Sequence, residues 1–288
     1  MEKKVVDLWK NWWKVWTKIG PPWRPSKKDI GFWEKRIEEL SKNKKLKVLL
    51  LGSTPEIRDM FARHDIPLTL LEANESMYEA MGKMRKVHSA PSDEKLVIGN
   101  WLEADRIFKE NRFDIVISDL PHCNIAYKDW PKFFTNIFNV LKPGGQFLLA
   151  TVTYGYPERQ TIEEMLEKYS KNKKYFADFK NRIWELYQVL NEPGILDKKE
   201  WRFNLYKLRE LVKKKAKKKF SLDEIDRNLV FIQGDLTGEL LNDVVEVGPP
   251  LEEQLIMQSK WFYLDSLYLV PDHPVFKIRR TMILKVKK

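Results

Sequence analysis

Between residues 46 and 153, short and uninterrupted apolar runs alternate with stretches of helical periodicity. The apolar runs are KVLLLG, LTLLEA, KLVIGNW, FDIVISDL and GQFLLATVT. Runs without polar alternation are typical of strands that are buried on both faces of a sheet. Five such strands separated by helices predict a parallel sheet with helices on both sides and right-handed crossovers between its strands.

Two more strand-like runs, residues 261–270 and 277–286, follow later in the chain. The PDHP segment between them is too short to hold a crossover helix, so the two runs are predicted to form an antiparallel hairpin. Residues 155–256 break the earlier rhythm, with many aromatic residues and few strand signals. Their periodicity predicts helices over 158–169, 175–190, 198–219 and 222–232.

The N-terminal segment carries tryptophans at helical spacing, which predicts an amphipathic helix over residues 2–19. Gly20 and the following PPWRP segment are expected to end this helix, and Ser26 is expected to cap a second helix that ends near Ser41. The tryptophan stripe has three interpretations: packing against the sheet domain, covering an apolar substrate, or attachment to a membrane surface. It consists of Trp9, Trp12, Trp13 and Trp16.

Charge and cysteine content narrow the classes of partner. The 288-residue chain holds 52 Lys and Arg against 41 Asp and Glu, a formal net charge of +11. A basic surface favours encounters with nucleic acid, anionic membranes or acidic ligands, although no named nucleic-acid-binding motif is present. The single cysteine excludes an intrachain disulfide and a zinc cluster built on several thiolates.

The sequence also bears on location. No apolar run approaches the ~20 residues that a membrane span requires. The N-terminus lacks the uncharged apolar stretch and the small-residue cleavage site of a signal peptide. A cytoplasmic protein without a membrane span is therefore predicted, and no feature of the sequence specifies an oligomeric state.

Polar residues follow the predicted strands, at the edge where open α/β sheets bind their ligands. Gly52, Ser53 and Thr54 come after the first strand, where glycine permits a tight turn and a new helix offers N–H groups to an anion. The turn lacks the GxGxxG pattern, which disfavours a dinucleotide pyrophosphate. Glu72 follows the second strand, twenty residues after Gly52. That spacing allows its carboxylate to accept both ribose hydroxyls of a nucleoside.

The five predicted strands and the residues next to them resemble, in the same order, the motifs of class I S-adenosylmethionine (SAM)-dependent methyltransferases. VLLLGSTPE resembles the first motif, LLEANESM the second, IGNW the third, FDIVISDL the fourth and LKPGGQFLLA the fifth. The resemblance covers residues 46–153 and the C-terminal hairpin, which matches the antiparallel seventh strand of the family. PWRPS, together with LGSTPE, is similar to a bacterial and archaeal subgroup with an LGxTPE loop.

The resemblance implies a Rossmann-like, doubly wound seven-stranded sheet with an antiparallel C-terminal hairpin, an N-terminal helical cap and a helical insert. The implied domains are the cap over residues 1–44, a SAM-binding core over 45–154, an insert that acts as a substrate lid over 155–256, and the hairpin over 257–288. Five aromatic residues line a pocket in the insert or form its own core: Tyr154, Tyr156, Trp184, Tyr187 and Trp201.

On the methionine and ribose side of the cofactor, the resemblance implies that Gly52, Ser53 and Thr54 line the methionine part and that Glu72 holds the ribose. The glycine-rich first motif of the family keeps only Gly52 here. Another group is therefore expected to help bind the methionine part. Arg24 in PWRPS is a candidate, because a guanidinium group pairs well with a carboxylate; the alternative is a surface arginine.

On the adenine and sulfonium side, the resemblance implies that Met77 lies near the adenine and that Trp101 flanks the ring. Asn100 stands where the family usually has an aspartate that reaches the adenine amino group. Asp119 follows the fourth strand and would face the sulfonium.

The implied reaction is an in-line displacement at the sulfonium methyl, for which the enzyme mainly supplies alignment. A base is needed only where the acceptor must lose a proton, and Asp119, His122 and Tyr127 are candidates because they follow the fourth strand. His122 has the alternative of a hydrogen-bonded structural histidine. Cys123 is interpreted as a small packing residue, and no metal site is predicted.

The sequence thus predicts a SAM-dependent methyltransferase that acts on an O or N atom. A small molecule is the favoured acceptor, because no nucleic-acid module accompanies the core. Three alternatives stay open: an RNA or protein methyltransferase, suggested by the positive charge; an aminopropyltransferase, which shares the core; and a SAM-binding protein without turnover. A nicotinamide dehydrogenase is disfavoured by the missing GxGxxG pattern and by the terminal hairpin.

Overall fold

The computed structural model describes residues 16–17, 20–21, 23–87, 93–154, 159–216, 220–221, 224, 244–269 and 279–288. Most of the predicted helix at 2–19, with Trp9, Trp12 and Trp13, lies outside the described residues. Most of the predicted helix at 222–232, the PDHP segment and Tyr156 also lie outside them.

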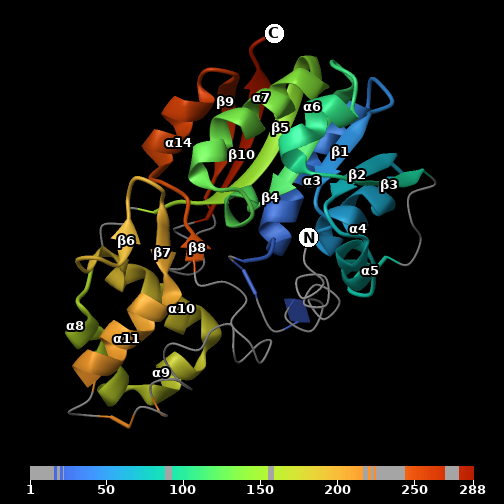
Figure 1. The fold of residues 1–288 in the computed structure, drawn as a ribbon. Helices are drawn as coiled ribbons and strands as arrows, with labels where there is room; N and C mark the ends of the chain where they lie inside the picture. The colour runs from blue at the N-terminus through green and yellow to red at the C-terminus, as the bar shows by residue number, and fades with distance from the viewer. Residues whose placement is uncertain are drawn as a thin grey trace.

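A seven-stranded sheet forms the centre of the molecule (Figure 1). Its strands lie in the order β3-β2-β1-β4-β5-β10-β9. The pairs among β1 to β5 are parallel, whereas β10 is antiparallel to both β5 and β9. The predicted parallel sheet with an antiparallel C-terminal hairpin is therefore confirmed. The strands are β1 (Val48–Leu51), β2 (Leu68–Glu72), β3 (Glu94–Ile98), β4 (Phe113–Asp119), β5 (Leu141–Val152), β9 (Phe262–Tyr268) and β10 (Arg279–Val286).

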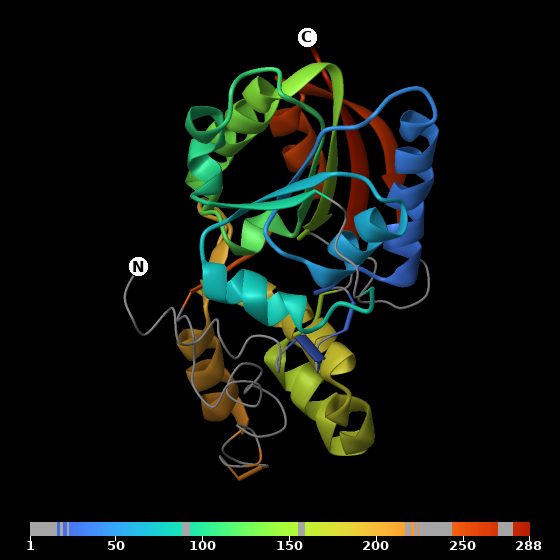
Figure 2. The ribbon, with the colours of Figure 1, turned by 90° about the vertical axis from the view of Figure 1, so that its right-hand side faces the viewer.

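Side chains of β1, β2, β4, β5 and β10 alternate between two hydrophobic clusters, one on each face of the sheet. Helices lie on both sides of the sheet (Figure 2). On β1, Val48 and Leu50 belong to the cluster that α3 and α4 cover, and Leu49 and Leu51 belong to the cluster that α6 and α7 cover. Burial on both faces explains why the strands lack polar alternation. The helices of the core are α3 (Lys27–Ser41), α4 (Pro55–Arg63), α5 (Glu75–Gly82), α6 (Ala104–Ile107), α7 (Trp130–Val140) and α14 (Leu251–Gln258).

Helix α3 begins and ends as the sequence predicts. The Ser26 hydroxyl accepts a hydrogen bond from the N–H of Asp29 (3.1 Å), and the Asp29 carboxylate accepts one from the N–H of Ser26 (2.9 Å). This reciprocal capping box satisfies two backbone donors at the start of the helix. It also fixes Asp29 at the first turn of α3, a position that matters for the site described below.

The insert between β5 and α14 lies at one end of the sheet in both views (Figures 1 and 2). It has its own hydrophobic cluster, which includes Tyr169, Phe176 and Val212, and a small sheet in the order β6-β7-β8. The N–H of Tyr154, just after β5, donates to the carbonyl of Gly248 (2.7 Å) and joins the insert to the core. Its elements are α8 (Ile162–Lys171), α9 (Lys173–Ala177), α10 (Phe179–Gln188), β6 (Leu196–Asp197), β7 (Arg202–Asn204), α11 (Leu205–Ala216) and β8 (Val244–Glu246).

The prediction for the insert was wrong in two places. The segment predicted as a helix over 198–219 begins with a turn over 198–201 and strand β7, and helix α11 starts only at Leu205. The segment predicted as one helix over 175–190 is divided at Asp178, whose backbone is extended. Strand β7 pairs with β8, about forty residues later in the chain, and with the two-residue strand β6, so the local sequence carries little strand pattern. Within the described residues, no helix is long and apolar enough to cross a membrane.

Candidate active site

The loop after β1 turns sharply at Gly52. Its φ angle of +94° lies in the left-handed region that favours glycine. Its N–H donates to the carbonyl of Leu71 (2.9 Å), which holds the loop beside the end of β2. A Cβ at this position would lie 3.3 Å from the Trp101 ring, so a larger residue would meet both backbone strain and the indole. Thr54 then takes the N-cap position of α4 without a capping bond from its side chain.

Glu72 ends β2 directly beside this loop. Ser53 Oγ donates to Glu72 Oε2 (2.7 Å), and the N–H of Ala73 donates to Oε1 (2.8 Å). Burial raises the pKa of Glu72, and these hydrogen bonds only partly oppose the shift. A carboxylate offers about four lone-pair positions, so both oxygens can accept further hydrogen bonds. Two neighbouring hydroxyl groups of a ligand, such as those of a ribose, match this arrangement.

Trp101 and Asn100 follow β3 on the other side of Glu72. The indole Nε1 of Trp101 donates to the carbonyl of Leu71 (2.8 Å), which fixes the ring against Gly52. Asn100 Oδ1 accepts from the N–H of Leu102 (2.9 Å) and caps the short helix η1 (Trp101–Glu103). The oxygen expected at an adenine amino group therefore already has one donor and retains one lone pair.

Arg24 forms an ion pair with Glu56, in the first turn of α4. Its Nε donates to Glu56 Oε1 (2.8 Å), its Nη2 reaches the same oxygen, and its Nη1 donates to the carbonyl of Trp16 (2.9 Å). The other Glu56 oxygen, Oε2, is buried and has no hydrogen-bond partner among the residues that the structure describes. Met77 on α5 packs against the cluster formed by Trp16 and Met81. This internal carboxylate was not predicted as a partner of Arg24.

Asp119 at the end of β4 is bound to Arg279 at the start of β10. Arg279 Nη2 donates to Asp119 Oδ1 (2.6 Å), and its Nε lies 3.3 Å from Asp29 Oδ2. Burial raises the pKa of Asp119 to about 6, although Arg279 opposes the shift. Burial would also raise the pKa of Asp29, but Arg279 and the hydroxyl groups of Thr281 and Ser26 outweigh it and lower that pKa.

His122 lies just after Asp119 in the short helix η2 (Pro121–Cys123) and is only 1% exposed. Its Nδ1 is 3.4 Å from Thr151 Oγ1, and its Nε2 is 3.3 Å from Cys123 Sγ. Burial lowers the pKa of His122 to about 3, and the charge of Arg279 adds to the shift. The imidazole is therefore neutral near pH 7, with an internal neighbour at each ring nitrogen. These contacts favour the structural interpretation of His122 over that of a base.

Tyr127 connects the core to the insert. Its hydroxyl, in η3 (Tyr127–Asp129), donates to Glu253 Oε1 on α14, which also accepts from Trp201 Nε1 (2.9 Å). Burial and the Glu253 carboxylate raise the pKa of Tyr127. A phenol that is held protonated in this way is a poor general base, so these contacts favour a positioning role.

Asp119 and His122 are expected to affect the pH dependence of the protein's stability in opposite directions. Between about pH 4 and 6 the folded state binds more protons at Asp119 than the unfolded state, so this group lowers stability as the pH rises. His122 binds fewer protons in the folded state, so it raises stability over the same interval. Relative to wild type, Asp119→Asn should become more stable with rising pH and His122→Gln less stable, each by up to about 1.4 kcal/mol per pH unit.

Urea denaturation of the three proteins at several pH values between about 4 and 6 measures these slopes. The two variants serve as controls for each other, because the expected deviations have opposite signs. If the free energy of unfolding of both variants changed with pH in the same way as that of wild type, the assigned pKa shifts of Asp119 and His122 would be contradicted.

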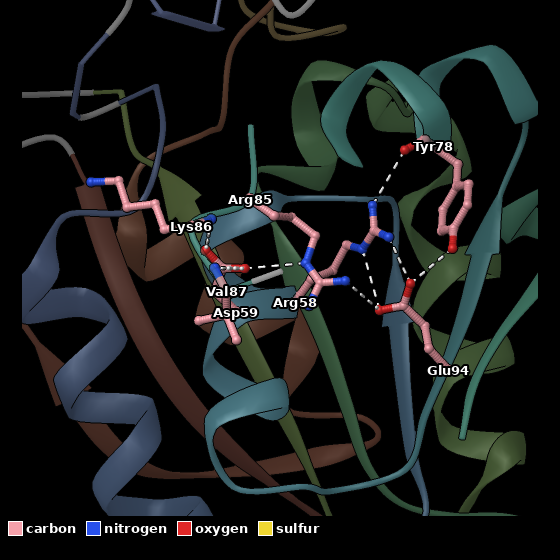
Figure 3. Close-up of polar contacts among 7 residues, drawn as sticks. All are labelled: Arg58, Asp59, Tyr78, Arg85, Lys86, Val87 and Glu94. Carbon is pink, nitrogen blue, oxygen red and sulfur yellow. Dashed lines mark hydrogen bonds and ion pairs between the residues drawn. The ribbon is translucent and has the colours of Figure 1, made fainter. Parts of the chain in front are cut away.

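Helices α4 and α5, whose first turns flank the Gly52 loop and Glu72, are tied to β3 by a buried network of ion pairs (Figure 3). Arg58 Nη2 donates to Glu94 Oε1 (2.6 Å), and the Tyr78 hydroxyl donates to the same oxygen (2.9 Å). Next to this pair, Arg85 Nε donates to Asp59 Oδ1 (3.1 Å). The network fixes the two helices relative to the strands that carry the site.

The residues at the strand ends fit an adenosine-containing methyl donor. Glu72 retains acceptor positions for a ribose, and Gly52 keeps the backbone free of a side chain where a Cβ would meet Trp101. Bound at such a site, SAM supplies a methyl group on a positively charged sulfur, which is open to in-line displacement. Among the described residues, no group of three or more His, Cys, Asp or Glu side chains could hold a metal ion.

Comparisons with known proteins support the fold and the class of protein. A family model described as a methyltransferase domain matches residues 43–215, more than half of the chain. The structure is similar to the CcbJ methyltransferase from Streptomyces caelestis, with a TM-score of 0.57 and 11% identity over 99% of both chains. It is also similar to the PH0226 protein from Pyrococcus horikoshii OT3, with a TM-score of 0.51 and 13% identity over 95% of this chain and 99% of that one.

A structure from Rhodobacter sphaeroides described as putative Zn-dependent alcohol dehydrogenases is similar as well, with a TM-score of 0.57 and 11% identity over 99% of this chain and 97% of that one. At such identities the similarity concerns the fold alone. A sequence search of the curated proteins finds no match.

The family match shows that the chain belongs to the methyltransferase domain family. It is a class I SAM-dependent methyltransferase, and SAM is its cofactor. The predicted enzyme class and cofactor are thereby confirmed, whereas membership of the LGxTPE subgroup stays a prediction.

Several charged residues at the site were missed by the sequence analysis. Arg279 stands in a strand run that is otherwise largely apolar, and a buried arginine there requires a carboxylate partner. Glu56 is part of the LGSTPE segment itself, directly after the proline that starts α4. Glu253 has no local signal, because its partners come from distant parts of the chain. The missed residues are Asp29, Glu56, Glu253 and Arg279.

Proposed function

We propose that this methyltransferase acts on an O or N atom of a small molecule bound at the carboxyl ends of β4 and β5. The supporting observation is the cluster in which Trp184 of α10 packs with Leu120 after β4 and Val152 at the end of β5. Trp23 and Tyr187 pack against this cluster, with their ring centroids 5.6 Å apart. Aromatic and aliphatic side chains of this kind suit an apolar or aromatic acceptor.

In this proposal each part of the chain has a task. The insert, residues 155–256, acts as a substrate lid over the SAM-binding core, residues 45–154. The N-terminal cap, residues 1–44, contributes Arg24 and Trp23, and the hairpin, residues 257–288, contributes Arg279. The aromatic cover orients the acceptor and excludes water, and such alignment contributes most of what a displacement of this kind requires.

The cofactor contacts are proposed residue by residue. Gly52, Ser53 and Thr54 line the methionine part, and Glu72 accepts hydrogen bonds from the ribose hydroxyls. Asp119 lies beside the sulfonium. On the far side of the ribose, three residues surround the adenine: Met77, Asn100 and Trp101.

Calorimetry with S-adenosylhomocysteine (SAH) tests the ribose contact. Glu72→Ala is expected to lose about 1–3 kcal/mol of binding free energy, because two ribose hydroxyls would lose a charged acceptor. Glu79→Ala is the matched control, since Glu79 is an exposed glutamate on α5 and should bind SAH as wild type does. Equal affinities for Glu72→Ala and wild type would refute the ribose contact.

Binding and activity assays with the same purified protein distinguish the alternative functions. Tighter binding of methylthioadenosine than of SAH would indicate an aminopropyltransferase. Methylation of RNA that falls steeply with salt would indicate a nucleic-acid substrate. Binding of SAH without turnover of any acceptor class would favour a SAM-binding protein without catalytic activity.

A further inference from the structure

Strand β9 stands at one edge of the central sheet, next to α14 (Figure 1). It pairs with β10 and with no other strand among the residues that the structure describes. The backbone N–H and C=O groups along the outer side of such a strand can pair with a further strand. Residues 262–269, which comprise β9 and the residue after it, are here called the β9 edge.

Large apolar side chains gather on the β9 edge. The described part of the chain has eight exposed side chains of this kind, and four of them belong to the β9 edge, each 37–61% exposed. They are Tyr263, Leu264, Leu267 and Leu269. Edge strands are commonly protected by lysine or proline, but residues 262–269 contain neither. The one charged residue, Asp265, pairs with Arg36 of α3 (3.2 Å) and with Lys285 of β10. The β9 edge is therefore apolar and balanced in charge.

These side chains project from both faces of the sheet. Leu264 faces the side of α7, because its partner on β10, Leu284, belongs to the cluster that α6 and α7 cover. Leu267 faces the same side through its partner Met282. Tyr263 precedes Leu264 in the strand and therefore faces the side of α3. A flat surface such as a membrane cannot cover both faces of one strand, whereas an added strand can, so the β9 edge fits another strand.

The sequence of the β9 edge reads nearly the same in both directions. Residues 262–269 are FYLDSLYL, so pairing about a point between Asp265 and Ser266 sets leucine opposite leucine and tyrosine opposite tyrosine. A strand that pairs with its own copy about a two-fold axis perpendicular to the sheet runs antiparallel to that copy, as this register requires. The pairs are Phe262 with Leu269, Tyr263 with Tyr268, Leu264 with Leu267, and Asp265 with Ser266.

A β-bulge makes this register possible. In a regular strand Asp265 and Ser266 would point to opposite faces and could not lie opposite each other across the two-fold axis. Here the register with β10 shifts between Ile283 and Leu284, so Asp265 is an extra residue. Asp265 binds Arg36 of α3. Ser266 pairs with Ile283, which belongs to the cluster that α3 and α4 cover, so both residues face the side of α3.

The outer pairs also join residues on one face. Tyr268 stacks on Phe32 of α3, with 5.2 Å between the ring centroids, and so faces the same side as the tyrosine opposite it. Phe262 belongs to the cluster that α6 and α7 cover, and Leu269 comes two positions after a leucine on that side. Because opposite residues match in face and in chemistry, a second copy of this strand is the occupant that fits.

We propose that two copies of the chain pair through their β9 edges in this register and form a two-fold dimer with one continuous sheet. The net charge of +11 does not prevent this pairing. Lys260 and Lys287 lie at the start of β9, where Lys287 Nζ is 4.6 Å from the centroid of the Tyr263 ring. Antiparallel pairing sets the two strand starts about 23 Å apart. This separation exceeds the Debye length of about 8 Å in physiological salt.

The dimer leaves both candidate active sites open. Strand β9 runs parallel to β5, because β10 is antiparallel to both. In the second copy every strand is reversed, so the carboxyl ends of its parallel strands lie at the opposite end of the joint sheet. The two inserts therefore lie at opposite ends as well, and the pairing is independent of the acceptor.

Sedimentation equilibrium of the full chain measures the association. Wild type is expected to be dimeric at about 10 μM. Leu267→Lys should raise the dissociation constant at least about tenfold, because the two-fold axis sets a lysine against the partner strand twice. Leu264→Lys should act in the same way. Ile98→Lys is the matched control, since Ile98 is also exposed but lies on β3, the opposite edge of the sheet, and this variant should associate as wild type does.

Disulfide cross-linking tests the register. Leu264→Cys and Leu267→Cys are made separately with Cys123→Ser, which removes the only cysteine. Opposite residues of antiparallel strands have Cβ atoms about 5 Å apart, close to the separation in a disulfide. An oxidised mixture of the two variants should therefore form a linked dimer. Each variant alone should not, because its cysteine is displaced by about 10 Å along the strand from the same cysteine in the partner.

A wild-type protein that stays monomeric at about 100 μM, or a dimer that neither lysine variant on β9 weakens, would overturn the proposal. Cross-linking of each cysteine variant alone as readily as the mixture would overturn the register. A monomer that binds anionic vesicles in wild type but not in Leu267→Lys would overturn the pairing and assign the β9 edge to a membrane surface instead.

Discussion

Replacing Arg279 with methionine is expected to lower the free energy of unfolding by about 3–5 kcal/mol near pH 7, because two buried carboxylates lose their cation. Asp29 and Asp119 both pair with this guanidinium, and at most 2% of each of the three side chains is exposed. Methionine is also unbranched and apolar, so the loss reflects charge more than volume. The difference in the free energy of unfolding between wild type and Arg279→Met should become smaller toward about pH 5, because the unpaired carboxylates take up protons there.

Urea denaturation of Arg279→Met and of Lys285→Met measures this effect. Lys285 lies on the same strand and pairs with Asp265, but its side chain is 45% exposed, so its loss should cost less than about 1 kcal/mol. Adding Asp29→Asn and Asp119→Asn to Arg279→Met should recover part of the loss, since no unpaired charge then remains. If Arg279→Met lowered the free energy of unfolding no more than Lys285→Met does, the conclusion that Arg279 balances two buried carboxylates would be contradicted.

Replacing Arg58 with methionine is expected to cost about 3 kcal/mol, at the lower end of the range for a broken buried ion pair. Arg58 and Glu94 are both 3% exposed, and the guanidinium also lies over the ring of Tyr78. The loss of stability should stay near the lower end of this range because the carboxylate of Glu94 keeps two other partners. Arg85 Nη1 lies 3.6 Å from Glu94, and the Tyr78 hydroxyl still donates to it.

Arg63→Met is the matched control for Arg58→Met. Arg63 lies on the same helix and pairs with Glu34 at 2.7 Å, but its side chain is 43% exposed. Thermal unfolding should therefore show a large decrease in Tm for Arg58→Met and a small one for Arg63→Met. Similar decreases would show that the network of Figure 3 contributes no more than a surface ion pair.

The central sheet was predictable because its strands are buried on both faces. Leu49, Leu50 and Leu51 are each at most 1% exposed, so nothing polar interrupts the run. The start of α3 was predictable for a similar local reason, since Ser26 and Asp29 cap one helix turn. Such signals are confined to a few neighbouring residues, and a single sequence carries them in full.

The insert was less predictable because only part of its strand pairing is local. Residues Arg202–Asn204 form β7 through hydrogen-bonded register with Val244–Glu246 and with Leu196–Asp197. A strand of three residues has too few positions to show a period of two. The strong helical pattern that follows it led to a prediction of helix from residue 198 onward.

The candidate site could be predicted in part. The residues that follow each parallel strand were located correctly at one edge, because parallel strands place their carboxyl ends together. The charges that surround Asp119 could not be located, because Arg279 is 160 residues away in the sequence. The partner of a buried charge is set by the packing of distant elements, which no motif spacing reveals.

The separation of Arg279 from Asp119 also matters for the order of synthesis. The ribosome makes β1 to β5 well before β10, and domains fold from the N-terminal side as they emerge. During that interval Asp29 and Asp119 have no guanidinium between them, and β5 has an unpaired edge. A nascent chain or a fragment that stops before residue 279 would therefore carry mutually repelling carboxylates beside the donor site. Insertion of β10 between β5 and β9 therefore completes the sheet and places the guanidinium of Arg279 between these carboxylates in the same step.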